Sequence, residues 1–136
     1  RALGVGGAGG GGIPSLRQES PYFYYHDRGE ACEAELDPRD LAVEQAVRAV
    51  PLPEDLPKAA RPGDEIAIAV DIQATARAAA TAGLAALQGE RGPTYDSLVL
   101  GGALILNQVG RHGALADAAD HVRRVLDSGR AAQRVR

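Results

Sequence analysis

The sequence predicts a mixed domain of the α/β or α+β class, in which short strands come first and three helices follow. The first observation is the alternation of apolar and polar residues from Glu30 to Leu36, which is typical of a strand with one buried face. The second is a C-terminal half of alanine- and leucine-rich stretches separated by Gly89 and Gly110, which are natural helix terminators. The 136 residues suit one modest core, so residues 1–136 are treated as a single domain.

Three strands are expected in the N-terminal third. Residues 1–5 indicate a short buried strand, and the aromatic run 22–25 favours a second, because aromatic side chains suit strands. A turn signal at 27–29 precedes the alternating run 30–36. The second and third strands are therefore expected to form a β-hairpin.

Capping residues mark the expected helices. Asp37 can accept hydrogen bonds from free backbone N–H groups and Pro38 suits a first helical position, so a short helix is predicted there. The proline-containing stretch at about 51–64 indicates an exposed loop or linker. Three helices are expected to follow, at about Ile72–Gln88 after a cap at Asp71, from Pro93 until Gly110, and over Leu115–Leu126. The second of them is apolar nearly all round, which predicts deep burial.

Composition excludes several classes of function. The net charge is −3 with acids and bases interspersed, so the chain has no global electrostatic footprint for nucleic acid. Cys32 is the only cysteine, which excludes an internal disulfide and a multi-cysteine metal site. The longest apolar run is far short of the ~20 residues of a membrane span, and no signal peptide is visible. A cytoplasmic protein without a membrane segment is expected, and the start at Arg1 predicts a fragment or a processed product.

The segment 6–12 is a glycine-rich loop without a chemically functional side chain. The pattern Gly4-x-Gly6-x-x-Gly9 matches the dinucleotide-binding fingerprint, but that fingerprint needs a helix directly after the glycines, and Pro14 and Pro21 follow instead. A flexible loop is favoured, and a loop that lets a ligand approach the backbone is the alternative, because glycine lacks a Cβ. The candidate loop residues are Gly6, Gly7, Gly9, Gly10, Gly11 and Gly12.

Aromatic and histidine side chains offer few candidates. The tyrosines of the aromatic run could form a stacking platform for bases, although packing is favoured. They are Tyr22, Tyr24 and Tyr25. No pair among His26, His112 and His121 has metal-ligand spacing, so surface histidines are predicted.

Cysteine, acids and arginines complete the candidates. Cys32 is expected to be a small buried hydrophobe. The paired acids at 54–55 and 64–65 could bind a cation, although solvated charge is favoured. A basic patch near the C-terminus could contact phosphate, although a solvated helix face is favoured. Its candidate contacts are Arg123, Arg124 and Arg130.

Several segments resemble, in order, the end of the anthranilate phosphoribosyltransferase family. Leu36–Ala42 is similar to a family segment that reads leucine, aspartate, proline, acid, aspartate, phenylalanine or leucine, glycine. Leu87–Pro93 resembles the family's leucine-x-glycine helix end and the turn after it. Further similar segments are Asp96–Ala103, Val109–Arg111, Ala118–Asp120 and Leu126–Ala131, which match a buried helix, a short glycine turn and a last helix ending in Asp-Ser-Gly-Lys-Ala.

The resemblance implies a larger protein with a helical domain and an α/β domain built on a mainly parallel sheet. This chain would supply its hairpin and its three closing helices. The family transfers a phosphoribosyl group from phosphoribosyl pyrophosphate to anthranilate, with magnesium, in tryptophan biosynthesis. The implied partners are the remainder of the parent chain, phosphoribosyl pyrophosphate, a small aromatic acceptor and a second copy in a homodimer. The family's two upstream substrate loops are absent from this sequence, so the 136-residue piece alone is not expected to be active.

The sequence departs from the family at its metal site. Alignment of the first strand puts Gly11 and Gly12 at the two acids that hold magnesium and Gly6 at a histidine, whereas magnesium needs hard anionic oxygens. Gly101 also replaces a common asparagine. No catalytic or metal-binding residue is therefore predicted in this chain, and the acceptor need not be anthranilate. The alternatives are a non-catalytic relative that binds nucleic acid through the C-terminal arginines, and an unrelated small α+β interaction domain.

Overall fold

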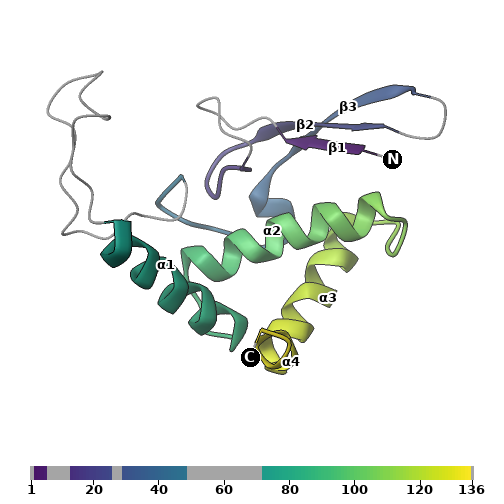
Figure 1. Cartoon of the computed structure of the whole chain (residues 1–136). Helices are drawn as coiled ribbons and strands as arrows, with labels where there is room; N and C mark the ends of the chain where they lie inside the picture. The colour runs from purple at the N-terminus through teal and green to yellow at the C-terminus, as the bar shows by residue number, and fades with distance from the viewer. Residues whose placement is uncertain (1, 6–12, 26–28, 49–71, 136) are drawn as a thin grey trace, which may run out of the picture.

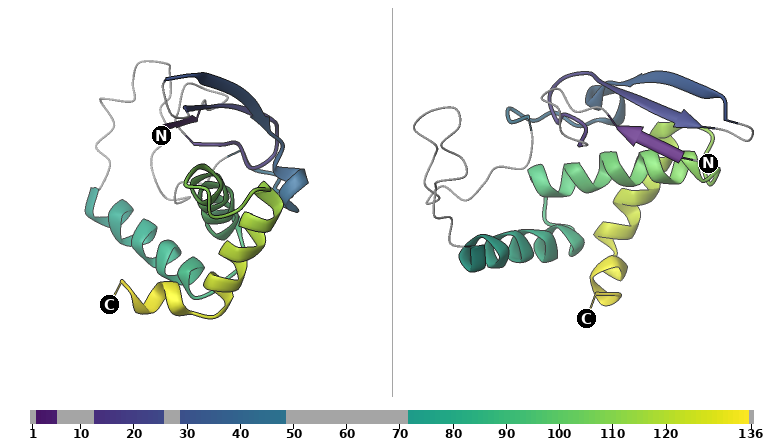
Figure 2. Two further views of the ribbon diagram at one scale, coloured as in Figure 1. Left: turned by 90° about the vertical axis from the view of Figure 1, so that its right-hand side faces the viewer. Right: turned by 45° about the horizontal axis from the view of Figure 1, so that its top comes forward.

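The computed structural model describes residues 2–5, 13–25, 29–48 and 72–135. These residues form a three-stranded sheet and four α-helices, and α2 lies between the sheet and the other helices (Figure 1). Two further views show the same arrangement around α2 (Figure 2). The elements are β1 (Ala2–Val5), β2 (Ser20–Tyr25), β3 (Ala31–Leu36), the 3-10 turn η1 (Pro38–Leu41), α1 (Ile72–Leu87), α2 (Pro93–Gln108), α3 (Leu115–Asp127) and α4 (Arg130–Gln133).

The described sheet is antiparallel throughout, in the order β1-β2-β3. The three expected strands and the hairpin are confirmed, but the mainly parallel sheet that the resemblance implied is not found in the part of the chain that the structure describes. Residues 26–30 join β2 to β3, and this link is too short for the crossover of about a dozen residues or more that parallel strands need.

One face of the sheet contributes to the hydrophobic core. Tyr22 and Leu36 are buried on this face, and Leu3, Val5 and Ala34 pack partly buried beside them. The opposite face is solvated and carries Phe23, Glu33 and Glu35, all of them exposed. The predicted alternation of β3 is thus confirmed, because its burial alternates along the strand.

The core is organised around α2. The inner side of this helix is fully buried against the sheet and against Ala118, Ala119 and Leu126, which belong to α3. The buried residues of α2 are Tyr95, Val99, Leu100, Ala103 and Leu104. A hydrogen bond of 2.7 Å from Gln45 Nε2 to Asp96 Oδ2 joins the strand-rich segment to the same helix.

The sequence predicts that α2 is buried on all sides, and this prediction is wrong for its outer face. Leu98, Ile105 and Val109 are 37%, 57% and 54% exposed. These residues form a stripe on the side of the helix away from its buried residues, because residues three, four and seven apart share a helix face. An apolar sequence without a polar face cannot show which side of a helix lacks a partner. We call these three residues the outer stripe.

The predicted start of the short helix at Asp37-Pro38 is confirmed, but the helix is a single 3-10 turn. The Asp37 carboxylate accepts a hydrogen bond of 2.9 Å from the Arg39 backbone N–H, and hydrogen bonding to Arg39 lowers the pKa of Asp37. The turn ends at Ala42, whose φ of 53° and ψ of 42° are left-handed. This backbone conformation directs the chain to Val43, which is buried in the core.

The three expected C-terminal helices are confirmed, and the first two end at the glycines that the sequence predicted, Gly89 and Gly110. Gly89 follows α1 with a φ of 93°, Gly110 follows α2 with a φ of 74°, and Gly129 separates α3 from α4 with a φ of 69°. Glycine adopts these left-handed conformations without the steric cost of a Cβ. The predicted cap at Asp71 and the linker at about 51–64 lie outside the described residues.

Replacing Ala42 by glycine should stabilise the fold. A left-handed alanine costs about 1–2 kcal/mol relative to glycine, so we expect Ala42→Gly to raise the free energy of unfolding by about 1 kcal/mol. Ala80→Gly, on the exposed face of α1, is the control and should lower it by about 1 kcal/mol. Urea denaturation of both variants and the wild type measures these changes. A lower free energy of unfolding in Ala42→Gly would contradict the prediction.

Alanine substitution at two neighbouring glycines of α2 should change the free energy of unfolding in opposite directions. A Cβ at Gly102 would lie 2.8 Å from Val122 Cγ2 on α3, whereas a Cβ at Gly101 would meet open space. Val122 is branched at its own Cβ and yields little. We expect Gly101→Ala to raise the free energy of unfolding by up to about 1 kcal/mol through helix propensity. We expect Gly102→Ala to lower it by about 1 kcal/mol through overpacking. Equal effects in urea denaturation would argue against this packing.

Candidate functional site

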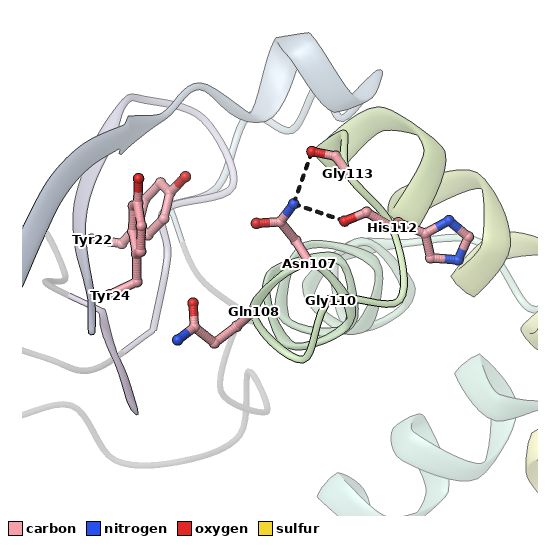
Figure 3. Close-up of a pocket in the computed structure, with 7 residues that line it drawn as sticks. All are labelled: Tyr22, Tyr24, Asn107, Gln108, Gly110, His112 and Gly113. Atoms are coloured by element: carbon pink, nitrogen blue, oxygen red, sulfur yellow. Dashed lines mark hydrogen bonds between the residues drawn. The ribbon is translucent and has the colours of Figure 1, made fainter. Parts of the chain in front are cut away.

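A hollow in the described residues lies between β2 and the C-terminal end of α2 (Figure 3). Its volume is about 350 Å³. One wall is formed by Tyr22 and Tyr24, whose ring centroids are 6.0 Å apart and whose planes are tilted by 30°. The lining residues are Tyr22, Tyr24, Asn107, Gln108, Gly110, His112 and Gly113. We call this feature the tyrosine pocket.

The wall opposite the tyrosines is held by one amide side chain. Asn107 Nδ2 donates hydrogen bonds of 3.0 Å to the His112 carbonyl and 3.2 Å to the Gly113 carbonyl. These bonds fix the turn between α2 and α3, which the left-handed Gly110 begins. The Asn107 amide oxygen lies on the side of the tyrosines, whereas the His112 ring is turned away from them toward α3 (Figure 3).

The tyrosine hydroxyls are neutral at physiological pH. Desolvation raises the pKa of Tyr22, and the charge of an ionised Cys32 on the adjacent strand is the main cause of the raised pKa of Tyr24. Tyr24 and Cys32 are direct cross-strand partners, so their side chains share the inner face of the sheet. No aspartate, glutamate, lysine or arginine of the described chain lines the pocket. The described lining of the pocket is therefore polar and uncharged.

The sequence-predicted stacking platform is mainly a packing element. Tyr22 is buried in the core and Tyr24 is half-buried beside it, in agreement with the interpretation favoured from the sequence. The Tyr25 side chain lies outside the described residues. Cys32 was expected to be buried and is only half-buried, because β3 is the edge strand of the described sheet.

The candidate glycines 6–12 lie outside the described residues, and so do the acid pairs at 54–55 and 64–65. The last residue of β1, Val5, pairs with Tyr22, which lines the tyrosine pocket.

The three candidate arginines have different surroundings. Arg123 Nη2 donates a hydrogen bond to the Leu41 carbonyl, and its Nη1 lies 3.1 Å from Asp120 Oδ1, so its guanidinium joins α3 to η1. Arg124 is exposed, and Arg130 Nε donates a hydrogen bond of 3.3 Å to Ser128 Oγ. Contact of these arginines with phosphate stays a prediction, but Arg123 already has internal partners.

Sequence reasoning missed a polar cluster that joins the start of α2 to the end of α3. The buried Tyr95 hydroxyl donates a 2.8 Å hydrogen bond to Asp127 Oδ1, and Arg91 Nη2 lies 2.8 Å from Asp127 Oδ2. The Arg91 guanidinium carbon also lies 4.3 Å from the centre of the Tyr95 ring. These groups are 32 and 36 residues apart in sequence, so only the folded backbone brings them together.

The histidines form a second contact that spacing did not indicate. The ring centroids of His112 and His121 lie 5.0 Å apart, and the ring planes are inclined by 63°. His121 is exposed, as predicted for a surface histidine, and His112 is half-buried. His26 lies outside the described residues. The contact crosses the turn between α2 and α3, so the number of residues between the two histidines gives no helical signature of it.

Comparisons with known proteins give no assignment: no model of a known protein family matches the chain, and no curated protein is similar to it. In the described part of the chain, no cluster of three or more histidine, cysteine or acidic side chains is arranged to hold a metal ion. None of the described helices combines the length and the apolar character needed to cross a bilayer.

The hydroxyl of Tyr95 should make stability depend on pH in the alkaline range. Burial, followed by the hydrogen bond to Asp127, raises the pKa of Tyr95 to about 12 from its ordinary value of 10.0. The folded protein thus holds this proton more tightly than the unfolded chain does, and the associated stability is complete below pH 10. It is lost as the pH rises from about 10 to about 12. Urea denaturation of the wild type should show this loss, and Tyr95→Phe should show less of it; parallel curves would contradict the assignment.

Proposed function

We propose that this chain is the C-terminal part of a phosphoribosyltransferase-like protein that resembles anthranilate phosphoribosyltransferase. One observation carries the proposal. Each family segment with a glycine at a turn falls on a left-handed backbone position in this structure. The four positions are Ala42, Gly89, Gly110 and Gly129.

Position 42 is the most informative of these sites. Three of the four positions are glycine, as in the family, so their conformation alone could reflect ordinary helix termination. Ala42 stands where the family segment has glycine, and it is the only non-glycine residue with positive φ in the described chain. The left-handed backbone at position 42 is therefore a physical reason for the family's glycine, although this sequence has alanine there.

In this proposal the chain contributes framework rather than catalytic groups. The polar groups described above mostly join elements of the fold: Asn107 holds a turn, Tyr95 and Asp127 join α2 to α3, and Arg123 joins α3 to η1. The aligned metal positions Gly11 and Gly12 offer no side-chain oxygen. Phosphoribosyl pyrophosphate, magnesium and an aromatic acceptor would therefore be held chiefly by the remainder of the parent chain.

Two uncharged surfaces support such a larger assembly. The outer stripe of α2 is an apolar helix face without a covering partner in the described residues. The outer edge of β1 pairs with no described strand, and its sequence Ala-Leu-Gly-Val has neither charge nor proline, the usual protections of an exposed edge. The other edge strand, β3, carries Glu33 and Glu35. We assign the β1 edge and the outer stripe to contacts with the remainder of the parent chain.

The proposal is tested on the longer polypeptide. We expect the sequence encoded before Arg1 to contain a Gly-Thr-Gly-Gly-Asp-like loop, and the longer product to bind phosphoribosyl pyrophosphate with magnesium in calorimetry. Residues 1–136 alone should bind neither, because the chain lacks that loop. An upstream sequence without the loop, or a longer product that binds no phosphoribosyl pyrophosphate, would overturn the proposal. Salt-sensitive binding of single-stranded DNA by such a product would instead favour the nucleic-acid-binding relative.

A further inference from the structure

We propose that His112 and His121 together bind a divalent transition-metal ion, such as zinc or nickel, at the turn between α2 and α3. The proposal is independent of the transferase assignment, because it uses only the geometry of this turn. The two rings come from different elements: His112 lies in the turn and His121 lies within α3. Their side chains meet with ring centroids 5.0 Å apart.

The separation of the rings matches that of two imidazoles on one metal ion. A zinc–nitrogen bond of about 2.1 Å and an angle of ~90–110° between two such bonds place the ring centroids about 4.6–5.3 Å apart. The observed 5.0 Å falls inside this interval. The ring planes are inclined by 63°, so the two imidazoles are not stacked face to face.

Both ligands are attached to backbone that is already fixed. The His112 carbonyl accepts the 3.0 Å hydrogen bond from Asn107, and this bond anchors the residue to the last turn of α2. His121 lies inside α3, next to Val122, whose side chain faces Gly102 on α2. Little chain entropy is then lost when a metal ion bridges the rings, which favours binding.

The surroundings fit a borderline-soft cation. His112 is half-buried and His121 is exposed, so the pair is accessible from solvent and its remaining coordination positions can be filled by water. Neutral imidazole nitrogen suits zinc, nickel and copper, whereas calcium and magnesium prefer oxygen. A site with two protein ligands binds more weakly than a closed structural zinc site of four ligands. We therefore expect a chelating surface site that clamps the α2–α3 turn.

Nickel titration of the full chain tests the site. At neutral pH we expect one nickel ion to bind in calorimetry and to raise the thermal unfolding midpoint, because a ligand that binds only the folded state stabilises it. His112→Gln and His121→Gln should each weaken binding at least about tenfold, since each removes one of two ligands. His26→Gln is the matched control and should bind as the wild type does. Magnesium in place of nickel should give no effect.

A second measurement on the wild type is independent of whether the variants fold. Diethyl pyrocarbonate modifies accessible imidazoles, and zinc should protect His112 and His121 together. Joint protection, with loss of nickel affinity in both variants, supports the proposal. Absence of nickel binding, equal affinity in His121→Gln and wild type, or protection of His26 instead of the pair would overturn it.

Discussion

The burial of α2 is the constraint on which the rest of this structure depends. The chain has few aromatic residues, and the largest fully buried side chain among the described residues is Tyr95 of this helix. Both the inner face of the sheet and the α3 helix bury their apolar surface against α2. The helices can approach closely because Gly102 leaves room for Val122. Polar cross-links then attach to the periphery of the same helix, at Tyr95 near its start and at Asn107 near its end.

Local signals in the sequence were sufficient to place most of the described elements. The alternation before Leu36, the cap at Asp37 and the terminating glycines act over a few residues, and the structure uses each of them. The antiparallel β2–β3 hairpin was predicted from the turn signal at 27–29, but the mainly parallel sheet taken from the resemblance is not found among the described strands, and the antiparallel pairing of β1 with β2 was not anticipated. The exposed side of α2 was also missed, since an apolar helix gives no periodic sign of a missing partner.

The site was much less predictable than the fold. Its groups come together from segments far apart in sequence, as with Tyr95 and Asp127, or across a turn, as with the two histidines. Residue spacing detects groups on one helix face or one strand face, and neither arrangement is of that kind. Arg123 shows the converse, because its basic local sequence indicated a solvated or phosphate-binding face while its guanidinium reaches the Leu41 carbonyl.

The Arg123–Leu41 contact has a consequence for the order in which the chain assembles. It joins residues 82 positions apart, whereas β1, β2 and β3 pair with their sequence neighbours and α2 packs on the helix that follows it. Closing a loop costs more entropy as the loop lengthens, so contacts between neighbouring elements form at a smaller entropic cost. The strand meander and the α2–α3 hairpin therefore make natural early units of folding. Their docking through η1 and Arg123, which closes a longer loop, is expected to follow.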